Sequence, residues 1–311
     1  MLGVCCHWVE MKSRPRSGVT FIENMMEERL LQLGRYRDGK YTEDAILATY
    51  RNNAQNLLRM LPLIRSAGVR LFRISSTLFP LADQVDRALW DNDEIRGLLA
   101  SVGQFILAED MRVTTHPGQF CVLSSDSDRV VENANTELAM HGWLFDAMGL
   151  PQTPQFAINI HGGKGDRASL LVDRILSLPP SVRGRLTLEN DETTYTVSDL
   201  AAVSAATGVP VTFDSHHHVF NEGGLSLSDA LYLAAGTWPR GIKPLQHISN
   251  TSPGLEGGSF TERRKHSDMI HYVPEPQLAL LREDLIDVEV EAKWKNLSVL
   301  KMSQDFQIPI G

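Results

Sequence analysis

The sequence predicts a (β/α)8 barrel of the TIM type, with a metal cluster at the C-terminal face of its strands. Eight short apolar segments, each followed by turn residues and a helical stretch, are spread over the 311 residues. Polar residues that can carry chemistry recur where these segments end, as they do in barrel enzymes. A doubly wound open sheet is the alternative, but no GxGxxG follows the first segment, which removes the main argument for it.

The predicted strands are short apolar runs bounded by turn residues. In chain order they cover residues 2–8, 69–76, 111–118, 156–163, 185–190, 209–217, 242–249 and 287–293. Amphipathic helices are predicted between them, for example over 42–68 and 132–149, where Gly68 and Gly149 suit the helix ends. Since no repeat, low-complexity tract or composition shift marks a linker, we expect residues 1–311 to form a single domain.

Composition sets limits on the class of protein. The hydrophobic fraction of 42% suffices for a large core, and the longest apolar runs fall far short of a membrane span of roughly 18–20 residues. The N-terminus lacks the basic and apolar regions of a signal peptide, and the three cysteines form no disulfide framework, so we expect a reducing, cytoplasmic setting. The net charge of −8 argues against a nucleic-acid partner but does not exclude one, because a metal-filled cleft with a few cations attracts phosphate.

Chemistry-bearing residues end six consecutive predicted strands. Strand by strand they are His116; His161; Glu189; Asp214 with the triplet His216, His217 and His218; His247; and Glu291 with Lys293. Alternation along 287–293 places Glu289, Glu291 and Lys293 on the face away from the helices. The sequence therefore predicts that these side chains converge inside one end of the barrel.

Converging imidazoles and carboxylates indicate bound metal, because carboxylates buried together without cations repel one another. Ligands of the His, Asp and Glu types suit Mn²⁺, Zn²⁺, Co²⁺ or Fe²⁺, and more than four candidates indicate two or three ions. Such clusters activate water and stabilise charge on a phosphoryl or carbonyl group. Taken singly, a strand-end histidine is more often structural, and a strand-end glutamate is as often an ion-pair partner. Six consecutive strand ends favour the metal interpretation.

Several residues stay ambiguous on local pattern alone. The pattern does not choose a ligand within the triplet, nor does it decide the role of His266, which follows a loop. His7, His141 and His271 lack the strand-end setting, and we expect them to be structural.

Two loop sequences and one long connection also stand beside the predicted ligands. HGGKGD (161–166) is either a phosphate-approach loop carrying Lys164 or an ordinary turn that needs glycine. HPGQF (116–120) holds Gln119 and Phe120, which form either a packed turn or a polar and aromatic wedge that enters a base stack. The stretch 251–265 is expected to be a long functional loop.

Longer motifs resemble those of the UV damage endonucleases, a DNA repair family related in fold to the endonuclease IV type of abasic-site nuclease. They are RISSTLFP (73–80), THPGQF (115–120), HGGKG (161–165), LENDE (188–192), FDSHHHV (213–219), HISN (247–250), RRKHSD (263–268) and VEAKWK (290–295). These motifs occur in order from about residue 70 to 295, so the resemblance covers most of the chain.

The resemblance implies a TIM barrel with a DNA-binding groove across its mouth and a cluster of two or three divalent ions, most often Mn²⁺, with Zn²⁺, Co²⁺ or Mg²⁺ as alternatives. The implied reaction is hydrolysis of the phosphodiester immediately 5′ to a lesion, leaving 3′-hydroxyl and 5′-phosphate ends. The implied substrates are cyclobutane dimers and 6-4 photoproducts in double-stranded DNA, together with other lesions including abasic sites. Family members are usually monomeric.

The same resemblance assigns roles to single residues. The implied ligands are His116, His161, Glu189, Asp214, His217, His247, His266 and Glu291. Gln119 and Phe120 take the probing role at the lesion. Independently of the resemblance, Lys293 shares a strand face with Glu291, and we expect it to add positive charge to the transition state as a catalytic residue. Basic residues expected to contact phosphates are Arg73, Lys164, Arg263, Arg264 and Lys265. The triplet is thereby resolved in favour of its middle member.

The chain departs from the family pattern at two positions. Many relatives carry a lysine two residues before the histidine of strand seven, in some a carboxylated metal ligand, and this chain has Leu245 there. The cluster then closes with water or another group, or one site is weaker. Relatives often read Leu-Gly-Tyr near the N-terminus where this chain has Val4, so a neighbour such as Trp8 would have to supply any probing contact.

Two rival functions remain open at the level of sequence. A metal-dependent sugar isomerase or epimerase also sets His, Asp and Glu at barrel strand ends, but it would turn over a monosaccharide and ignore DNA. A scaffold without chemistry would bind lesions and leave them uncut. The HPGQF wedge and the number of predicted ligands favour the nuclease.

Overall fold

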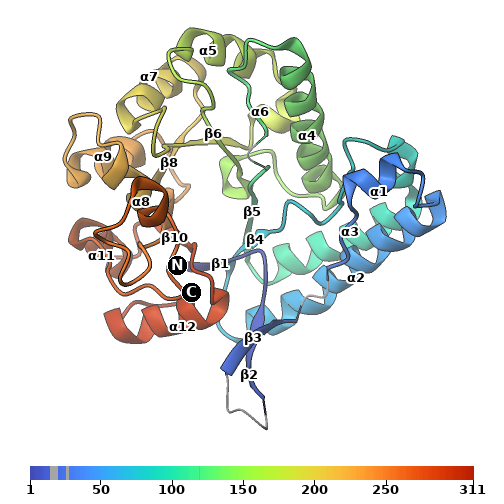
Figure 1. Ribbon diagram of the computed structural model, residues 1–311, viewed down its shortest axis with the longest axis horizontal. Helices are drawn as coiled ribbons and strands as arrows, with labels where there is room; N and C mark the ends of the chain where they lie inside the picture. Colours follow the sequence, from blue (N-terminus) through green and yellow to red (C-terminus); the bar gives the residue numbers. More distant parts are fainter. Residues whose placement is uncertain (15–19, 26–27, 119) are drawn as a thin grey trace.

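Eight parallel strands close into a barrel in the computed structural model (Figure 1). Around the barrel they are β1 (Leu2–Cys5), β10 (Asp287–Val290), β9 (Leu245–Ile248), β8 (Val211–Asp214), β7 (Leu186–Glu189), β6 (Ile158–His161), β5 (Arg112–Thr115) and β4 (Leu71–Ile74), which pairs again with β1. The structure describes residues 1–14, 20–25, 28–118 and 120–311. Each barrel strand lies inside one predicted segment, so the TIM-barrel prediction is confirmed.

Helices surround the barrel as an outer layer (Figure 1). They are α1 (Leu33–Arg37), α2 (Glu43–Ser66), α3 (Asp93–Ala108), α4 (Asp128–Ala147), α5 (Ala168–Ser177), α6 (Pro180–Arg183), α7 (Val197–Thr207), α8 (Ser215–Phe220), α9 (Leu227–Ala235), α10 (Phe260–Arg263), α11 (Glu275–Arg282) and α12 (Lys295–Phe306), with short 3-10 turns η1 (Arg87–Leu89) and η2 (Pro154–Phe156). The helices predicted over 42–68 and 132–149 correspond to α2 and α4. Gly68 and Gly149 follow them with φ of 86° and 70°, the left-handed conformation that ends a helix. Among the described residues, we find no helix with the length and apolar character that crossing a bilayer requires.

The hydrophobic core lies between the barrel and the helices. Alternate strand residues such as Phe72, Ile160, Leu188 and Val288 are fully buried there, as expected for strands covered on their outer face. The interior of the barrel is largely polar instead. Arg112 on β5 pairs with Asp287 on β10, and because these strands are not neighbours in the sheet, the contact crosses the interior.

Polar and apolar groups together close the N-terminal end of the barrel. Arg112 donates to Asp287 at 2.7 Å and to the carbonyl oxygens of Gln155 and Lys243, while the N-terminal ammonium of Met1 lies 3.0 Å from Asp287. A small apolar cluster consists of Leu71, Ala157, Trp238 and Leu245, all buried. This closed end leaves the opposite, C-terminal end of the strands for the site.

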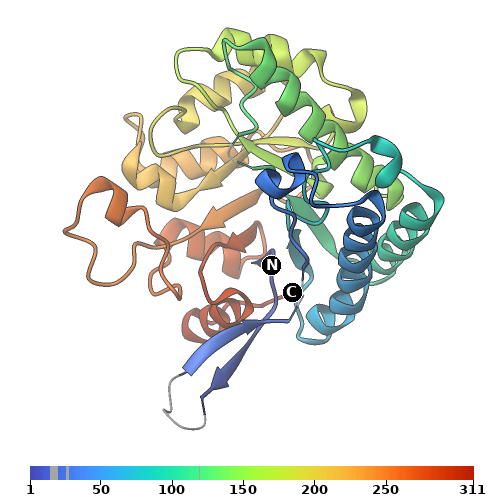
Figure 2. The same ribbon diagram turned by 45° about the vertical axis from the view of Figure 1, so that its right-hand side comes forward.

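A two-stranded antiparallel hairpin projects from the barrel and was not predicted (Figure 2). It consists of β2 (Val9–Ser13) and β3 (Thr20–Asn24), which follow β1. Most of its side chains are exposed, so the sequence carries little of the apolar pattern by which strands are recognised. At its base, the amide of Asn296 accepts from the backbone N–H of Val9 at 2.7 Å and donates to its carbonyl at 3.0 Å.

Gly103 in α3 packs against the end of α4, and this contact can be tested. A Cβ atom at Gly103 would lie 1.7 Å from the carbonyl oxygen of Met148, whereas one at Gly97 in the same helix would meet nothing within 4 Å. We expect Gly103→Ala to lower the free energy of unfolding by about 1–3 kcal/mol through overpacking. Gly97→Ala should raise it by up to about 1 kcal/mol through helix propensity. Urea denaturation measures both, and a stabilised Gly103→Ala variant would contradict the packing.

Candidate metal centre

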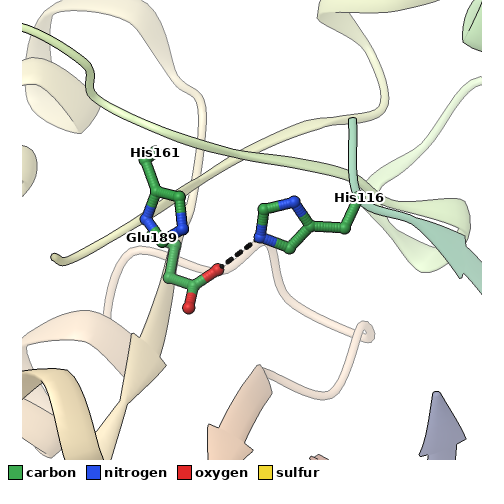
Figure 3. A group of neighbouring side chains, drawn as sticks. All are labelled: His116, His161 and Glu189. Atoms are coloured by element: carbon green, nitrogen blue, oxygen red, sulfur yellow. Dashed lines mark hydrogen bonds and ion pairs between the residues drawn. The ribbon is translucent and has the colours of Figure 1, made fainter. Parts of the chain in front are cut away.

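The carboxylate of Glu189, at the end of β7, contacts three imidazoles inside the barrel. Its Oε2 atom lies 3.0 Å from Nε2 of His116, which directly follows β5 (Figure 3). Its Oε1 atom lies 3.2 Å from Nδ1 of His217 and 3.1 Å from Nδ1 of His247. His161, at the end of β6, lies beside His116 with ring centroids 5.2 Å apart. Strand ends distant in the sequence thus deliver four imidazoles to one carboxylate.

These side chains form three overlapping groups that could each hold an ion. The groups are His116 with His161 and Glu189, Glu189 with Asp214 and His217, and Glu189 with His247 and Glu291, and within each the ligand atoms lie within 4.8 Å of one another. Glu189 belongs to all three groups, so one carboxylate joins them. Seven of the eight residues predicted as ligands are brought together in this way.

His266, the eighth predicted ligand, lies at the edge of these groups. Its Nδ1 atom is 3.8 Å from Oε2 of Glu291, and its side chain is partly exposed. An isolated bridge between Thr251 and His266 and a bond from the Ser252 hydroxyl to the carbonyl of His266 hold this segment against the chain after β9. The loop predicted over 251–265, which includes α10, therefore lies between β9 and His266.

Orphaned buried atoms indicate that the donor set fits divalent ions. Oδ2 of Asp214 and Nδ1 of His161 are both buried without a hydrogen-bond partner. Leaving such atoms unpaired costs about 1–3 kcal/mol each, and more for charged groups. Carboxylate oxygens and imidazole nitrogens are ligands that suit Mn²⁺ and Zn²⁺. The residues at this site therefore fit the metal cluster that the sequence predicts.

The histidine triplet begins a short helix whose first residues are fixed by Asp214. Oδ1 of Asp214 caps α8 by accepting from the backbone N–H groups of His216 and His217, both at 2.7 Å, which leaves Oδ2 for the cluster. Successive helical residues point about 100° apart, so the three rings separate. His217 faces Glu189, His216 bonds to the hydroxyls of Ser249 and Thr251, and His218 packs beside Phe213.

Charge coupling inside the barrel shifts the pKa values of the cluster. Burial alone would raise the pKa of Glu189, but the charges of His247 and His161, with hydrogen bonds from His116 and His217, hold it well below its usual range. Burial alone would lower the pKa of His247, whereas the attraction of Glu189 raises it to about 10. Burial alone would also lower the pKa of His217, but the negative charges of Asp214 and Glu189 raise it. Without metal, protons on these imidazoles therefore balance the negative charge of the carboxylates. Bound cations would balance that charge in their place.

The residues predicted to bind DNA occupy different settings. Gln119 lies outside the described residues. Phe120 is 78% exposed, which is unusual for an aromatic side chain on a turn beside a polar site. Lys164 pairs with Asp126 at 3.0 Å, and Arg264 pairs with Glu192 at 2.7 Å.

The remaining predicted cations differ sharply in exposure. Arg263 lies over the ring of Phe220 at 5.2 Å, and the side chain of Lys265 is exposed. Lys293 is half-exposed and lies 3.6 Å from Asp268. Arg73 instead lies inside the barrel, where it pairs with Glu289 and Glu291, so a direct contact with a DNA phosphate would require these ion pairs to break.

Three residues without an assigned role in the sequence analysis also contact the cluster. Asn159 donates to Oε2 of Glu189 at 2.5 Å, and Glu192 lies 3.7 Å from Nε2 of His217. Glu289 lies 3.1 Å from Nε2 of His247. Alternation places Asn159 and Glu289 on the same strand face as a predicted ligand two residues later, but it assigns them no role.

The two positions that depart from the family pattern lie away from the cluster. Leu245 is fully buried in the apolar cluster with Leu71, Ala157 and Trp238. Val4 is fully buried in the main core, against which the partly buried Trp8 packs. Leucine offers no ligand atom, so the three groups around Glu189 are formed without a ligand from position 245.

Comparison with known proteins decides the family. The family model described as UV-endonuclease UvdE matches residues 17–309. The chain belongs to the UV-endonuclease family. It is 34% identical to the UV DNA damage endonuclease of Nostoc sp. over 305 residues, an alignment that covers 96% of this chain and 88% of that protein. Membership in the UV-endonuclease family supports a DNA endonuclease of UV-damage repair.

Two solved structures show the fold of the UV-endonuclease family and of a more distant relative. The crystal structure titled SacUVDE matches with a TM-score of 0.79 and 26% identity, covering 99% of each chain. Endonuclease IV from Thermus thermophilus matches with a TM-score of 0.57 and 15% identity, covering 81% of this chain and 94% of that one. The second likeness concerns the fold alone, and it agrees with the predicted relation between the two barrel types.

The raised pKa values of His217 and His247 predict how the EDTA-treated protein responds to pH. The pKa of both histidines in the folded protein lies above the ordinary value of 6.5. Their protonation therefore contributes its full stabilisation below about pH 6.5, and this stabilisation is lost as the pH rises through the folded-state pKa, which is about 10 for His247. We expect the free energy of unfolding to fall between about pH 7 and about pH 10. Saturating Mn²⁺ should reverse the fall, because cations replace the released protons. Urea denaturation across this range measures the effect, and a flat curve without metal would contradict it.

Proposed function

We propose that this chain hydrolyses the phosphodiester immediately 5′ to UV photoproducts in double-stranded DNA, leaving 3′-hydroxyl and 5′-phosphate ends. Cyclobutane dimers and 6-4 photoproducts are the main substrates, and abasic sites are among the others. The observation that carries the proposal is the set of three overlapping ligand groups on Glu189, in a chain that belongs to the UV-endonuclease family. We propose that the enzyme acts as a monomer in the cytoplasm, where its three thiols remain free.

The proposed ligands are the eight residues of the cluster: His116, His161, Glu189, Asp214, His217, His247, His266 and Glu291. When bound, two or three divalent ions, most often Mn²⁺, supply an activated water and neutralise charge on the phosphoryl oxygens. Glu189 joins the three groups, so its carboxylate sets their spacing. Lys293, half-exposed beside the ligand strand, adds positive charge where the phosphate arrives.

Lesion recognition is proposed for Phe120 together with Gln119. An aromatic ring that is 78% exposed at the mouth of the barrel can fill the gap left by an unstacked base pair. Damage lowers the cost of unstacking, so recognition rests on deformability rather than base identity. Phosphate contacts are proposed for Lys164, Arg263, Arg264 and Lys265, which lie outside the buried cluster.

Incision of a damaged duplex tests the proposal. A labelled duplex with one thymine dimer should be cut just 5′ to the dimer in the presence of Mn²⁺, and EDTA should abolish the cut because the ligand groups are then empty. The same duplex without damage is the control and should stay intact. Binding without cutting would favour a lesion-binding scaffold, and neither binding nor cutting by folded, Mn²⁺-loaded protein would favour a sugar isomerase or epimerase.

The histidine triplet offers a residue-level test of the same centre. His217→Ala should reduce incision by more than about 100-fold, because His217 faces Glu189 and is a proposed ligand. A residue that only supports a ligand typically costs about 10–100-fold when it is lost. His216→Ala and His218→Ala are matched controls on the same helix and should lose no more than about tenfold, since their rings face other groups. Circular dichroism confirms that each variant is folded. Equal losses for all three variants would refute the proposed role of His217.

A further inference from the structure

Glu289 is a buried carboxylate on the ligand strand β10 that belongs to none of the three ligand groups. It lies two residues before Glu291, and its side chain is 1% exposed. Both of its oxygens are engaged. Oε1 accepts a hydrogen bond from the hydroxyl of Thr114, and Oε2 accepts from Nε of Arg73 at 2.6 Å. This distinguishes it from Asp214, whose Oδ2 atom has no hydrogen-bond partner.

Arg73 forms ion pairs with both Glu289 and the proposed ligand Glu291. Its guanidinium lies 2.5 Å from Oε2 of Glu289 through Nη2 and 2.6 Å from Oε1 of Glu291 through Nη1. Its Nη2 atom also lies 3.0 Å from Nε2 and 3.4 Å from Nδ1 of His247. Because arginine can only donate, Nη2–H and a protonated Nε2 would both point at Oε2 of Glu289, which lies 2.5 Å and 3.1 Å from them. Its side chain is 8% exposed, so these contacts are shielded from water. Opposite charges attract more strongly in such a buried setting. The arginine therefore compensates the charge of Glu289 and leaves that carboxylate as a hydrogen-bond acceptor rather than a ligand.

The two nitrogen atoms of His247 contact different carboxylates. Nδ1 lies 3.1 Å from Glu189 and 3.4 Å from Glu291, which are both members of its ligand group. Nε2 lies 3.1 Å from Oε2 of Glu289, which belongs to none of the ligand groups. Metal-binding histidines commonly donate their second N–H to a carboxylate, which fixes the tautomer and the ring orientation and raises ligand basicity. Glu289 occupies the place of that carboxylate.

We propose that Glu289, held by Arg73 and Thr114, is a positioning residue of the metal centre: it accepts the Nε2–H of His247 and so presents Nδ1 to the ion shared with Glu189 and Glu291. This inference rests on the proposed metal centre, and it assigns to Arg73 a place in the network rather than on the DNA. His247 is fully buried, so solvent offers it no alternative acceptor.

The same strand supplies a matched comparison. Asp287, two residues before Glu289, forms an equally buried ion pair with Arg112 at 2.7 Å. That pair contacts the chain terminus and loop carbonyls but none of the eight proposed ligands. Loss of either carboxylate breaks a buried ion pair and destabilises the fold. Only loss of Glu289 should also change how metal is bound.

Manganese binding by Glu289→Gln and Asp287→Asn tests the proposal. Each protein is freed of metal with EDTA and titrated with Mn²⁺, and free Mn²⁺ is measured by its electron paramagnetic resonance signal. We expect Glu289→Gln to bind the wild-type number of Mn²⁺ ions, while the affinity of one site falls about 10–100-fold. Losses of this size are typical when a residue that hydrogen-bonds to a metal-binding histidine is removed. Asp287→Asn should bind Mn²⁺ as the wild type does, although both variants are less resistant to urea.

The other outcomes contradict either the proposed role of Glu289 or the proposed metal-dependent function. Unchanged affinity in Glu289→Gln, or an equal loss in Asp287→Asn, would overturn it, because the pair would then serve stability alone. Loss of one whole ion would make Glu289 a ligand and also overturn it. If the wild type binds no Mn²⁺, the proposed function fails instead.

The conservative variant Glu289→Asp keeps the charge and applies if Glu289→Gln does not fold. Its carboxylate is one methylene further from His247, so we expect a smaller loss of Mn²⁺ affinity at one site, of up to about tenfold. Wild-type affinity in this variant would overturn the proposal.

Discussion

The carboxylate of Glu189 lies within 3.2 Å of nitrogen atoms from three histidines, and this contact organises the C-terminal end of the barrel. The histidines come from β5, α8 and β9, so their convergence requires the closed sheet rather than any local sequence. A buried carboxylate is stable only where positive charge surrounds it. The barrel supplies that charge by imidazolium protons, which cations can displace.

Charge in the barrel interior is arranged in layers along β10. Asp287 is paired with Arg112, Glu289 is paired with Arg73, and Glu291 lies between Arg73 and the histidines. An arginine keeps its charge at any ordinary pH and cannot bind a metal, whereas a histidine can release its proton and become a ligand. The change from arginine to histidine toward the C-terminal end therefore sets the depth at which ions can bind, and it leaves the deeper layers as fixed ion pairs.

Patterns short enough to be local were predictable from the sequence. Period-two alternation and strand ends located the eight strands and the inward direction of residues such as His161 and Glu291. Which groups pair across the interior was not predictable, because Arg73 and Glu289 are 216 residues apart and meet only when β1 closes the sheet between β4 and β10. For the same reason Arg73 read as a surface cation. The β2–β3 hairpin was missed because its polar, exposed residues give little periodic signal.

Leu245 shows how a change of residue type can be absorbed by the layer in which it lies. In register, Leu245 is opposite Asp287 and His247 is opposite Glu289, so the leucine lies one layer deeper than the histidine. In that layer Leu245 packs with Leu71, Ala157 and Trp238. Leucine fills that layer with apolar volume, and the carboxylates of the three ligand groups come from the ends of β7 and β8 and from the residue after β10. The three ligand groups therefore share Glu189 and include no atom of the residue at position 245.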